Sequence, residues 1–456
     1  MFVWLILAET GFSIFEPVCL KNMRPSILLN VPVYRQGQGS IRSLAVSGEC
    51  PVSGRACEAT AAGPVDCEMI KAAVVCPKPL LRNHIMFINF WYPACLSEEL
   101  TDAPLKVRIL GQDLVVFRDA EGTAACLSNT CTHRGGSLGD GKLLNGNVQC
   151  PYHGWEFDGA GVCRKIPSLG KDASIPGRTR IDAYPVEERY GIVFAFLGDL
   201  PEAERPPIME IPTFDQEGWR PTWMTYEVDI NYERSVENGL DPAHNEFVHP
   251  THGFSGANAE YKVNELRMVD EDYEWGFGFF SKFNSPPAKE GSVMAKYKTA
   301  KGDREAGSGH SGPNHLWTII RFSEEAEFGQ YAYEAPIDET RVKIFLINMR
   351  NMALEPEKDD SITEKNWYVA KQDIDVLEEL HPVVTPDTNT KEFMVPADKV
   401  ILMYRDLLEG WADKGWRIDT AEVARNEKRV AYAIPSPARR EHKGWVLDPV
   451  PLVNPD

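Results

Sequence analysis

Between about residues 83 and 200, apolar residues come in short runs with the alternation that is typical of half-buried β-strands. Residues 107–128 read VRILGQDLVVFRDAEGTAACLS, in which β-branched and aromatic runs are separated by the turn signals Gly-Gln and Asp-Ala-Glu-Gly. A further apolar run at residues 190–198 ends this stretch. The pattern predicts a small all-β domain, which we place at residues 83–206.

The second half of the chain mixes strand and helix signals after a proline-rich acidic linker at residues 199–212. Strand patterns occur at residues 275–283 and 340–349, and helical patterns occur at residues 363–380 and 396–414. This mixture predicts an α+β domain at residues 207–456. Residues 285–313 are rich in Gly, Ser and Lys, and we expect them to form a mobile loop.

Residues 1–82 differ in composition from the rest of the chain. They contain a short apolar run, FVWLILA, that lacks the preceding basic residue of a secretory signal. The residues after this run are rich in Pro, Gly, Ser and Ala and show no clear period. We expect a loosely ordered N-terminal extension. A start codon assigned too far upstream, with the true start near Met69 or Met86, is an equal alternative.

The charge and the cysteine content narrow the classes of partner. The formal net charge of −19 would repel nucleic acid and anionic membranes, so neither is expected as a partner. No run approaches the length of a spanning helix. Ten cysteines in 456 residues are too few for a disulfide scaffold, which favours a reducing cytoplasm.

Two short motifs in the first domain each carry one cysteine and one histidine. Cys131 and His133 belong to CTHRGG, and Cys150 and His153 belong to CPYHGW. Structural zinc sites usually take like ligands in pairs, so zinc is the weaker alternative here. A Rieske cluster requires the mixed arrangement, because two thiolates hold one of its irons and two imidazoles hold the other. The motifs therefore predict a Rieske [2Fe–2S] cluster bound by these four residues.

The glycines Gly135, Gly136 and Gly154 fit this prediction, since they let the backbone approach a cluster closely. Together with NFWYPACLSEEL at residues 89–100, the two motifs resemble the terminal oxygenase α subunits of the Rieske non-haem iron oxygenases. The resemblance covers about residues 84–440, and the phthalate-dioxygenase-like branch fits best. It implies an all-β Rieske domain followed by an antiparallel-sheet plus helix (helix-grip) catalytic domain.

A candidate for a second iron site lies in ENGLDPAHNEFVHP, which contains Asn238, Asp241, His244 and His249. Mononuclear non-haem iron takes two histidines and one carboxylate, with open positions for O₂ and substrate. Residues five apart lie about 140° apart around a regular helix, so both histidines cannot face one metal from an undistorted helix. Pro250 disfavours helical geometry at His249. We therefore expect the helix to end or bulge there and to return His249 to the side of His244.

The carboxylate ligand is expected from the helical segment EKNWYVAKQDIDVLEELHP at residues 364–382. On a helical projection Asp373 lies within an apolar arc, whereas Asp375 lies on the polar side. A carboxylate on an apolar face is costly unless it is paired or binds metal, which favours Asp373. The resembled family carries its carboxylate in an acidic-Asp pair, of which the first residue is Gln372 here. Asp375 remains the alternative ligand.

The resemblance also implies roles for the remaining residues. Asp241 would bridge the cluster ligand His153 of a neighbouring subunit to His244, so that electrons cross an interface in a homotrimer; helix capping is its alternative role. Asn238 would bond the iron's water or lie nearby, with an ordinary buried amide as the alternative. Because no dinucleotide-binding glycine fingerprint occurs, electrons from NAD(P)H would come through a separate ferredoxin or flavin reductase.

The resulting hypothesis is a terminal oxygenase that uses a Rieske cluster, mononuclear Fe(II) and O₂. It would hydroxylate or oxidatively demethylate a small, largely apolar or aromatic substrate, by mono- or dioxygenation. The alternative is a Rieske electron-transfer protein without oxygenase chemistry. Trp275, Phe277 and Phe279 alternate along one expected strand and form either part of a substrate pocket or plain core.

Overall fold

The computed structural model describes residues 41–49, 56–65, 86–171, 173–252, 254–271, 273–284, 303–386 and 391–453. The chain divides into two compact units, one formed by residues 1–80 with residue 456 and the other by residues 81–455. In the first unit, strands β1 (Ile41–Glu49) and β2 (Ala56–Val65) pair antiparallel. The rest of the predicted extension and Met69 lie outside the described residues, so both interpretations of this region stay predictions.

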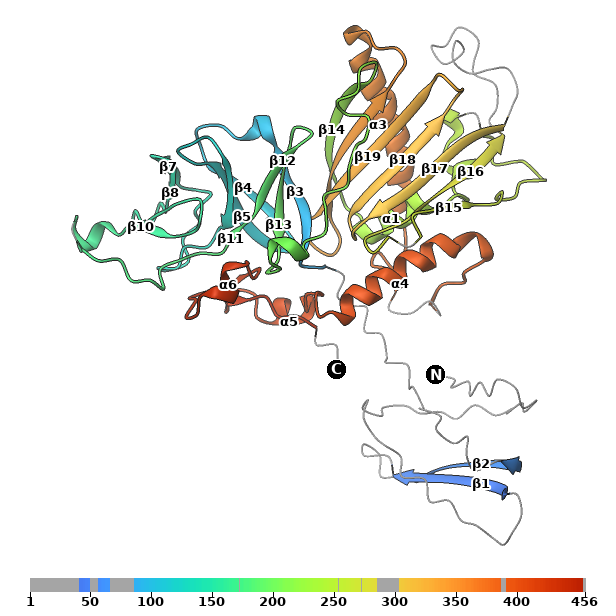
Figure 1. Cartoon of the computed structure of the whole chain (residues 1–456), viewed down its shortest axis with the longest axis horizontal. Coiled ribbons are helices and arrows are strands. Elements are labelled where there is room, and N and C mark those ends of the chain that lie inside the picture. The colour runs from blue at the N-terminus through green and yellow to red at the C-terminus, as the bar shows by residue number, and fades with distance from the viewer. Residues whose placement is uncertain are drawn as a thin grey trace. The chain divides into compact units, whose positions relative to one another are not determined.

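Three small antiparallel sheets build the first domain of the second unit (Figure 1). Their orders are β11-β6-β5-β4, β12-β13-β3 and β10-β9-β8-β7. The strands are β3 (Phe90–Leu96), β4 (Leu105–Ile109), β5 (Gln112–Arg118), β6 (Ala124–Ser128), β7 (Lys142–Leu144), β8 (Asn147–Gln149), β9 (Glu156–Phe157), β10 (Cys163–Lys165), β11 (Ala183–Tyr184), β12 (Val186–Arg189) and β13 (Ile192–Leu197). The expected all-β domain is therefore present.

The second domain is built on a seven-stranded antiparallel sheet with the order β14-β20-β19-β18-β17-β16-β15. Its strands are β14 (Arg220–Val228), β15 (Arg267–Val269), β16 (Gly278–Asn284), β17 (Asp303–Ser311), β18 (His315–Arg321), β19 (Glu327–Pro336) and β20 (Val342–Arg350). The helices are α1 (Tyr232–Leu240), α2 (Asn245–Val248), α3 (Asp359–Leu377), α4 (Lys399–Asp413), α5 (Thr420–Arg425) and α6 (Ala438–Glu441). The α+β prediction is confirmed.

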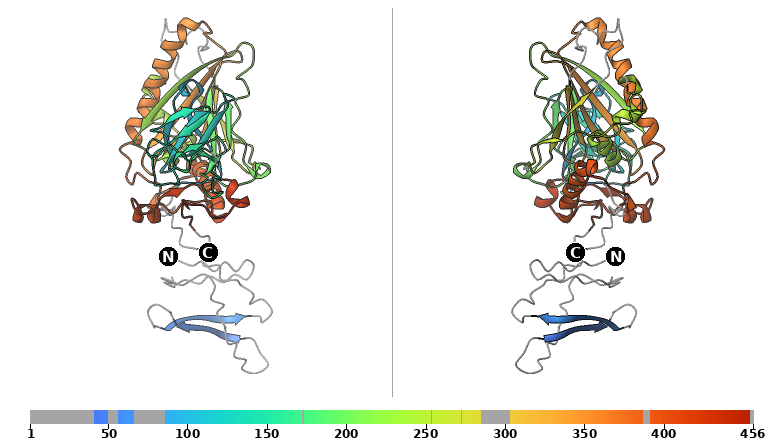
Figure 2. Two further views of the ribbon diagram at one scale, coloured as in Figure 1. Left: turned by 90° about the vertical axis from the view of Figure 1, so that its left-hand side faces the viewer. Right: turned by 90° about the vertical axis from the view of Figure 1, so that its right-hand side faces the viewer.

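The two faces of the large sheet have different neighbours. Side chains alternate between the faces along each strand. On one face, Tyr333 of β19 packs edge-on against Phe194 of the first domain, with ring centroids 5.0 Å apart. On the other face, Ala332 and Leu346 share a core cluster with Ile374 and Leu377 of α3. Figure 2 shows α3 in orange on one side of the sheet in both views.

Residues 285–313 were expected to form a loop, and this prediction is wrong for its second part. Asp303–Ser311 is strand β17, paired with β16 and β18. Its glycines have a steric reason: a Cβ at Gly309 would lie 2.4 Å from the ring of Trp317. Residues 285–302 lie outside the described part of the chain, so the loop prediction stands untested there.

The expected aromatic stripe is core. Phe277 and Phe279 are 4% and 5% exposed and belong to the main hydrophobic cluster. Trp275 stacks on Trp416, with ring centroids 6.3 Å apart and planes 8° apart. Of the two readings of this stripe, packing is therefore the one that the structure supports.

The C-terminal segment returns to the first domain. Strands β21 (Tyr432–Ala433) and β22 (Asp448–Pro449) flank α6, and Ala433 and Leu447 pack into the core that contains Cys131 and Cys150. Asp182, which is fully buried, accepts two hydrogen bonds from the Arg439 side chain at 2.7 Å. The division of the chain at residues 206 and 207 stays a prediction, because this segment belongs in space to the earlier domain.

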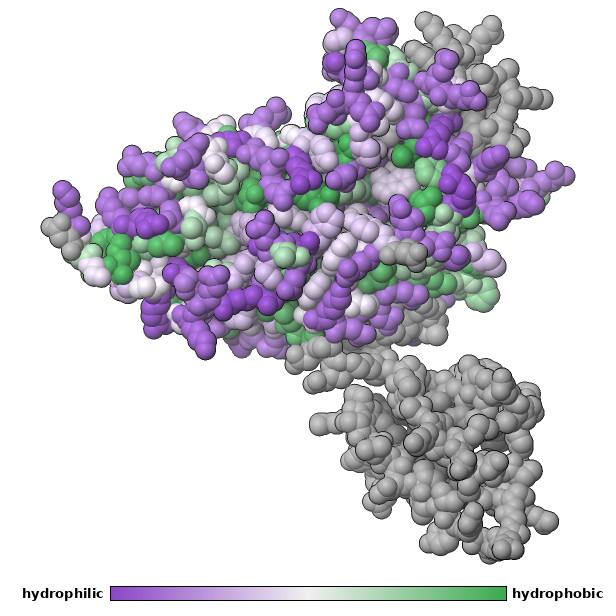
Figure 3. Space-filling model, viewed as in Figure 1, coloured by the Kyte–Doolittle hydropathy of each residue, from purple (hydrophilic) through white to green (hydrophobic). Residues whose placement is uncertain are grey.

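Polar residues cover most of the molecular face in Figure 3, with apolar residues scattered among them. Among the described residues, no helix combines the length and the apolar character that crossing a bilayer requires. The cytoplasmic location stays a prediction.

A buried carboxyl group lies between β19 and α1. Glu334 is 1% exposed, and its Oε1 accepts a hydrogen bond of 2.7 Å from the hydroxyl of Ser235 on α1. Burial raises the pKa of Glu334 to about 8. The side chain is therefore neutral in the folded protein at pH 7, whereas it ionises near pH 4.3 in an unfolded chain.

This difference predicts that Glu334 makes the stability of the fold depend on pH. Glu334→Gln should remove that contribution. Between about pH 4.3 and 8 the folded state holds a proton that the unfolded state has lost. Each rise of one pH unit in this range therefore lowers the free energy of unfolding by up to about 1.4 kcal/mol. Below about pH 4.3 the stabilising contribution of Glu334 is fully present. Thermal unfolding of both proteins from pH 5 to 8.5 should show a smaller decline in the variant. Parallel declines would mean that Glu334 ionises freely in the fold.

Candidate functional site

The two Cys–His motifs form two loops with the same backbone pattern. In one loop the Gly135 amide donates to the Cys131 carbonyl at 2.9 Å, and in the other the Gly154 amide donates to the Cys150 carbonyl at 3.0 Å. Both glycines have φ of +71°, a left-handed conformation that side chains disfavour. The glycine four residues after each cysteine is thus required by the turn itself.

Side chains from the two loops converge. The sulfur-bearing Cys131 and Cys150 are 1% and 2% exposed, whereas His133 and His153 are exposed, with ring centroids 4.4 Å apart. A Cβ at Gly136 would lie 2.8 Å from the Cys150 sulfur, so only glycine fits there. Burial raises the pKa of the Cys131 thiol to about 12, so a thiolate there needs a cation beside it. This donor set fits a Rieske cluster.

The helical backbone is interrupted on both sides of the short helix that separates His244 from His249. Helix α1 ends at Leu240, and the short helix α2 begins after His244 and ends before His249. His249 has φ −110° and ψ 69°, outside helical geometry, and Pro250 is the next residue. The two imidazole rings consequently lie together, with centroids 5.2 Å apart.

Helix α3 brings Asp373 to this histidine pair. The Asp373 Oδ1 lies 3.3 Å from the His249 Nε2 and 3.6 Å from the His244 Nε2. One ligand atom from each residue lies within 4.8 Å of the others, so among the described residues these three form a group that could hold a metal ion. Two imidazoles and one carboxylate on one side of a metal are the donor set of mononuclear non-haem iron. The residues present therefore fit such an iron.

Asp375, the alternative ligand, lies on the other side of α3. Its side chain is 60% exposed and forms an ion pair with Lys371. The neighbouring Val376 is also exposed, at 46%. The structure thus brings Asp373 to the histidines and directs Asp375 to solvent.

Neighbouring groups orient two of the three candidate ligands. The His244 Nδ1 lies 2.7 Å from the Asp241 carbonyl oxygen, so a proton on Nδ1 is donated there and Nε2 is free to face a metal. Burial lowers the pKa of His244, which favours the neutral imidazole that binds metal. The Asn238 Nδ2 donates to the Asp373 Oδ1 at 3.1 Å, a contact that sequence reasoning had not expected.

The third ligand is oriented by a residue that sequence reasoning missed. The His249 Nδ1 lies 3.1 Å from the Gln372 Oε1, which also accepts a hydrogen bond of 2.9 Å from the hydroxyl of Thr251. A proton on Nδ1 again leaves Nε2 for a metal. Gln372 was noticed only as a departure from an acidic residue, although a polar neighbour of a ligand is a common site for such support.

The carboxylate of Asp241 has a local role in this chain. Its Oδ1 accepts a hydrogen bond of 2.7 Å from the Ala243 amide, and its Oδ2 is 3.9 Å from the His244 Nδ1. Asp241 is also the C-terminal cap of α1. Within one chain, the direct contact with His244 is therefore made by the Asp241 carbonyl oxygen. Its expected bridging role between subunits stays a prediction.

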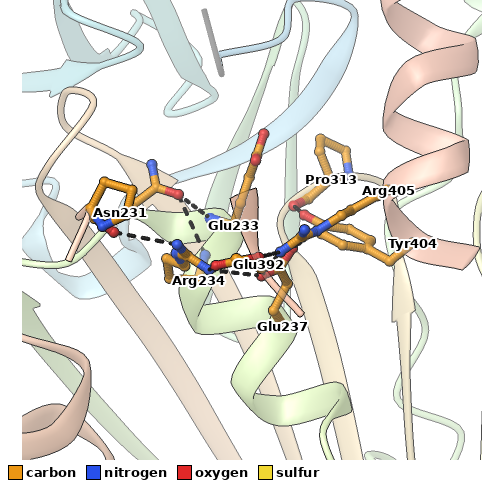
Figure 4. A network of polar contacts seen from close by, with 9 residues as sticks. Asn231, Glu233, Arg234, Glu237, Pro313, Glu392, Tyr404 and Arg405 are labelled. Atoms are coloured by element: carbon orange, nitrogen blue, oxygen red, sulfur yellow. Dashed lines mark hydrogen bonds and ion pairs between the residues drawn. The ribbon is translucent and has the colours of Figure 1, made fainter. Parts of the chain in front are cut away.

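A buried charge network, defined as Arg234, Glu237, Glu392 and Arg405, joins α1 to α4 (Figure 4). The Arg405 guanidinium donates to Glu237 at 2.5 and 2.8 Å and to Glu392 at 2.8 Å. Arg234 donates to Glu392 at 2.6 Å. Because two cations face two anions and each is hydrogen-bonded, the burial of these charges is compensated. The network fixes the helix that carries Asn238 and leads to His244.

Comparison with known proteins agrees with this geometry. The model of the Rieske [2Fe-2S] domain matches residues 90–185, and that of the vanillate O-demethylase oxygenase C-terminal domain matches residues 228–414. The oxygenase component of dicamba O-demethylase from Stenotrophomonas maltophilia is 38% identical over 249 residues, which are 54% of this chain and 68% of that protein. The chain belongs to the Rieske non-haem iron oxygenases.

A solved relative extends the similarity to the fold. The structure of NdmA from Pseudomonas putida with caffeine has a TM-score of 0.59 and 26% identity, and covers 70% of this chain and 90% of that one. Several other curated relatives match over less of their length. The oxygenase subunit of tert-butanol monooxygenase from Aquincola tertiaricarbonis is 38% identical over 176 residues, 38% of this chain and 36% of that protein.

Family membership confirms the predicted fold and cofactors. Rieske oxygenases of this kind use a Rieske [2Fe–2S] cluster, a mononuclear iron and O₂. The assignment of these cofactors to individual residues of this chain stays a prediction.

The iron content should identify the carboxylate ligand. We expect about three irons and two sulfides per chain in anaerobically purified protein, and a loss of about one iron but no sulfide in Asp373→Ala and in His249→Ala. Asp375→Ala is the matched control and should keep all three. If Asp375→Ala loses an iron and Asp373→Ala keeps it, Asp375 is the ligand instead. Zinc without sulfide would contradict the presence of a Rieske cluster.

Gln372→Leu should weaken iron binding by about 10- to 100-fold, because His249 loses the acceptor that orients it. Gln372→Glu should bind iron at least as well as the unaltered protein, since a carboxylate also accepts the Nδ1 proton. Competition with a chelator measures both affinities. Thr251→Val leaves the Gln372 oxygen in place and serves as the control. Equal affinity in Gln372→Leu would show that His249 needs no such partner.

Proposed function

We propose that this Rieske oxygenase is the terminal oxygenase component of a multi-protein system. It would hydroxylate or oxidatively demethylate a small, largely apolar or aromatic substrate with O₂. The convergence of His244, His249 and Asp373, in a chain that also holds the two Cys–His loops, is the observation that carries this proposal. The names of the relatives, which include a dicamba O-demethylase and a methylxanthine demethylase, support a small ring compound.

In this proposal the cluster is held by Cys131, His133, Cys150 and His153. Fe(II) is held by His244, His249 and Asp373, which we call the metal triad. The cluster would supply electrons and the iron would supply O₂ activation when both are bound. The protein's contribution is positional: the Asp241 carbonyl, Gln372 and Asn238 keep the three triad side chains turned toward one point. Of the three side chains His249 is the most buried, at 4%, whereas His244 and Asp373 are partly exposed.

Electrons would arrive from NAD(P)H through a separate ferredoxin or flavin reductase. We further propose a homotrimer in which His153 of one subunit approaches Asp241 of the next, and Asp241 leads to His244. Two observations support this arrangement: the imidazole of His153 is at the surface, beside Tyr152 that is 57% exposed, and the Asp241 side chain is 24% exposed. These groups are therefore open to a neighbouring chain.

Turnover with a surrogate NADH-dependent reductase tests the proposal. The substrates are aromatic compounds and O-methyl or N-methyl ring compounds, and mass spectrometry with ¹⁸O₂ detects incorporated oxygen or released formaldehyde. We expect products with the unaltered protein and at most a trace with His249→Ala, whose cluster absorbance should be intact. No product from any substrate, with a cluster that the reductase still reduces, would favour the alternative, an electron-transfer protein.

A further inference from the structure

The C-terminal segment, defined as residues 436–446, packs on the first domain although the catalytic domain precedes it in the sequence (Figure 1). Its anchor is Asp182, which is 0% exposed. This carboxylate accepts hydrogen bonds from the amide and the hydroxyl of Ser436 at 3.1 and 2.8 Å, and from the Arg439 Nε at 2.7 Å. Because a buried charge is paired and fully hydrogen-bonded here, the position of the segment is strongly specified.

The C-terminal segment lies against residues 162–180 of the first domain. The ring of Trp445 is 4.8 Å from the guanidinium carbon of Arg439 and 5.8 Å from that of Arg180, so it contacts a cation of each segment. Beside this contact, residues 162–180 form a cavity of about 400 Å³ whose lining includes Arg164 and Arg180. The two segments therefore make one continuous surface with a hollow that arginines border.

Both segments are basic, whereas the chain as a whole has a net charge of −19. Residues 162–180 contain five basic residues and one acidic residue, and residues 436–446 contain three basic residues and one acidic residue. Four of the basic side chains pair with carboxylates: Arg164, Lys165, Arg439 and Arg440. The other four have no carboxylate partner among the described residues, and we call them the basic face: Lys171, Arg178, Arg180 and Lys443. Three of these four are exposed, and Arg180 is half-buried.

The segment that carries most of the basic face also touches the proposed cluster loops. Cys163 belongs to the same hydrophobic core as Cys131 and Cys150. A Cβ at Gly154 would lie 3.2 Å from the Cγ of Pro167, so the chain after Cys163 packs directly on the loop that carries Cys150. Electrons pass between proteins over short distances only, which makes a surface that adjoins the cluster loops suitable for their entry.

The histidine side of the cluster loops has another neighbour in the proposed homotrimer. There the exposed His153 approaches the next subunit, so an electron donor has to approach from a different side. The cysteine side is buried in the core that Cys163 shares, and the basic face belongs to the chain that covers this side. The basic face is therefore next to the cluster loops and apart from the edge that the homotrimer uses.

We propose that the basic face is the docking surface of an acidic electron-transfer protein that reduces the cluster. Local positive charge steers an acidic partner to this surface, although the rest of the chain repels it. One electron passes from the reduced carrier, which is oxidised, to the cluster, which is reduced, and no covalent bond forms or breaks. The C-terminal segment contributes Lys443 to the surface and contacts Arg180 through Trp445. This inference rests on the proposed function and adds where its redox partner binds and which charge that partner carries.

The rate of cluster reduction tests the proposal without substrate turnover. The probe is a pre-reduced plant-type [2Fe–2S] ferredoxin, an acidic carrier whose reduction potential lies below that of Rieske centres, so the transfer is downhill. Stopped-flow absorbance under anaerobic conditions follows the reduction of the full-length protein. We expect the second-order rate constant to fall steeply as NaCl is raised from about 10 mM to 1 M, because the Debye length shrinks from about 30 to 3 Å.

Charge reversal separates the basic face from the net charge of the protein. The double variant Arg178→Glu/Lys443→Glu changes two exposed side chains, so it should fold normally and keep the absorbance spectrum of the cluster. At about 10 mM NaCl we expect it to be reduced about tenfold or more slowly than the unaltered protein, with the difference lost at 1 M. The matched control is Lys282→Glu/Lys399→Glu, which makes the same change of charge at exposed positions of the catalytic domain and should be reduced at the unaltered rate.

Three results would overturn the proposal. The double variant could be reduced as fast as the unaltered protein at low salt, or the control could be slowed as much as the double variant. The ferredoxin could also fail to reduce an unaltered protein that dithionite reduces. None of these results bears on the oxygenase proposal, because cluster reduction requires neither the substrate nor the mononuclear iron. Conversely, a chain that yields no product can still be reduced through the basic face.

Discussion

The geometry of the metal triad depends on holding two distant segments of the chain on one sheet face. Asn238 and Asp373, which touch at 3.1 Å, are 135 residues apart in the sequence. Buried or half-buried ion pairs fix both segments. The buried charge network ties α1 to α4, and Arg220 with Arg350 holds Asp359 at the start of α3. Removing one partner of such a pair leaves an uncompensated charge, so each pair specifies position strongly.

The hydrogen bonds around the triad also fix the orientation and the tautomer of its histidines. Without them, metal-free histidines can rotate and exchange tautomers. Each imidazole has an acceptor at Nδ1, and Asp373 has a donor in Asn238. Both acceptors are neutral, one a backbone carbonyl and one an amide. With Fe(II) bound, two neutral histidines and a single carboxylate would therefore carry a net charge of about +1. A carboxylate at position 372 would cancel this remaining charge.

Local constraints made much of this site predictable. The cluster loops are set by glycines within six residues, and Pro250 marks the break that returns His249 to His244. The choice of Asp373 over Asp375 came from helical periodicity. The role of Gln372 could not be derived, because it depends on where α3 docks against α2. Strand β17 was missed because its glycines make room for the rings of Phe280 and Trp317 on neighbouring strands, a requirement invisible along the sequence.

The alternation of side chains lets single strands serve both structure and chemistry. On β19, Tyr331 and Tyr333 belong to the main core, which includes the first domain, whereas Ala332 and Glu334 face α1 and α3. A slip of one residue in register would exchange these sets. It would bury Glu334 against Phe194 and turn two tyrosines toward the metal layer. The pairing of β19 with β20 from Phe328 to Pro336 therefore protects the site as much as the core.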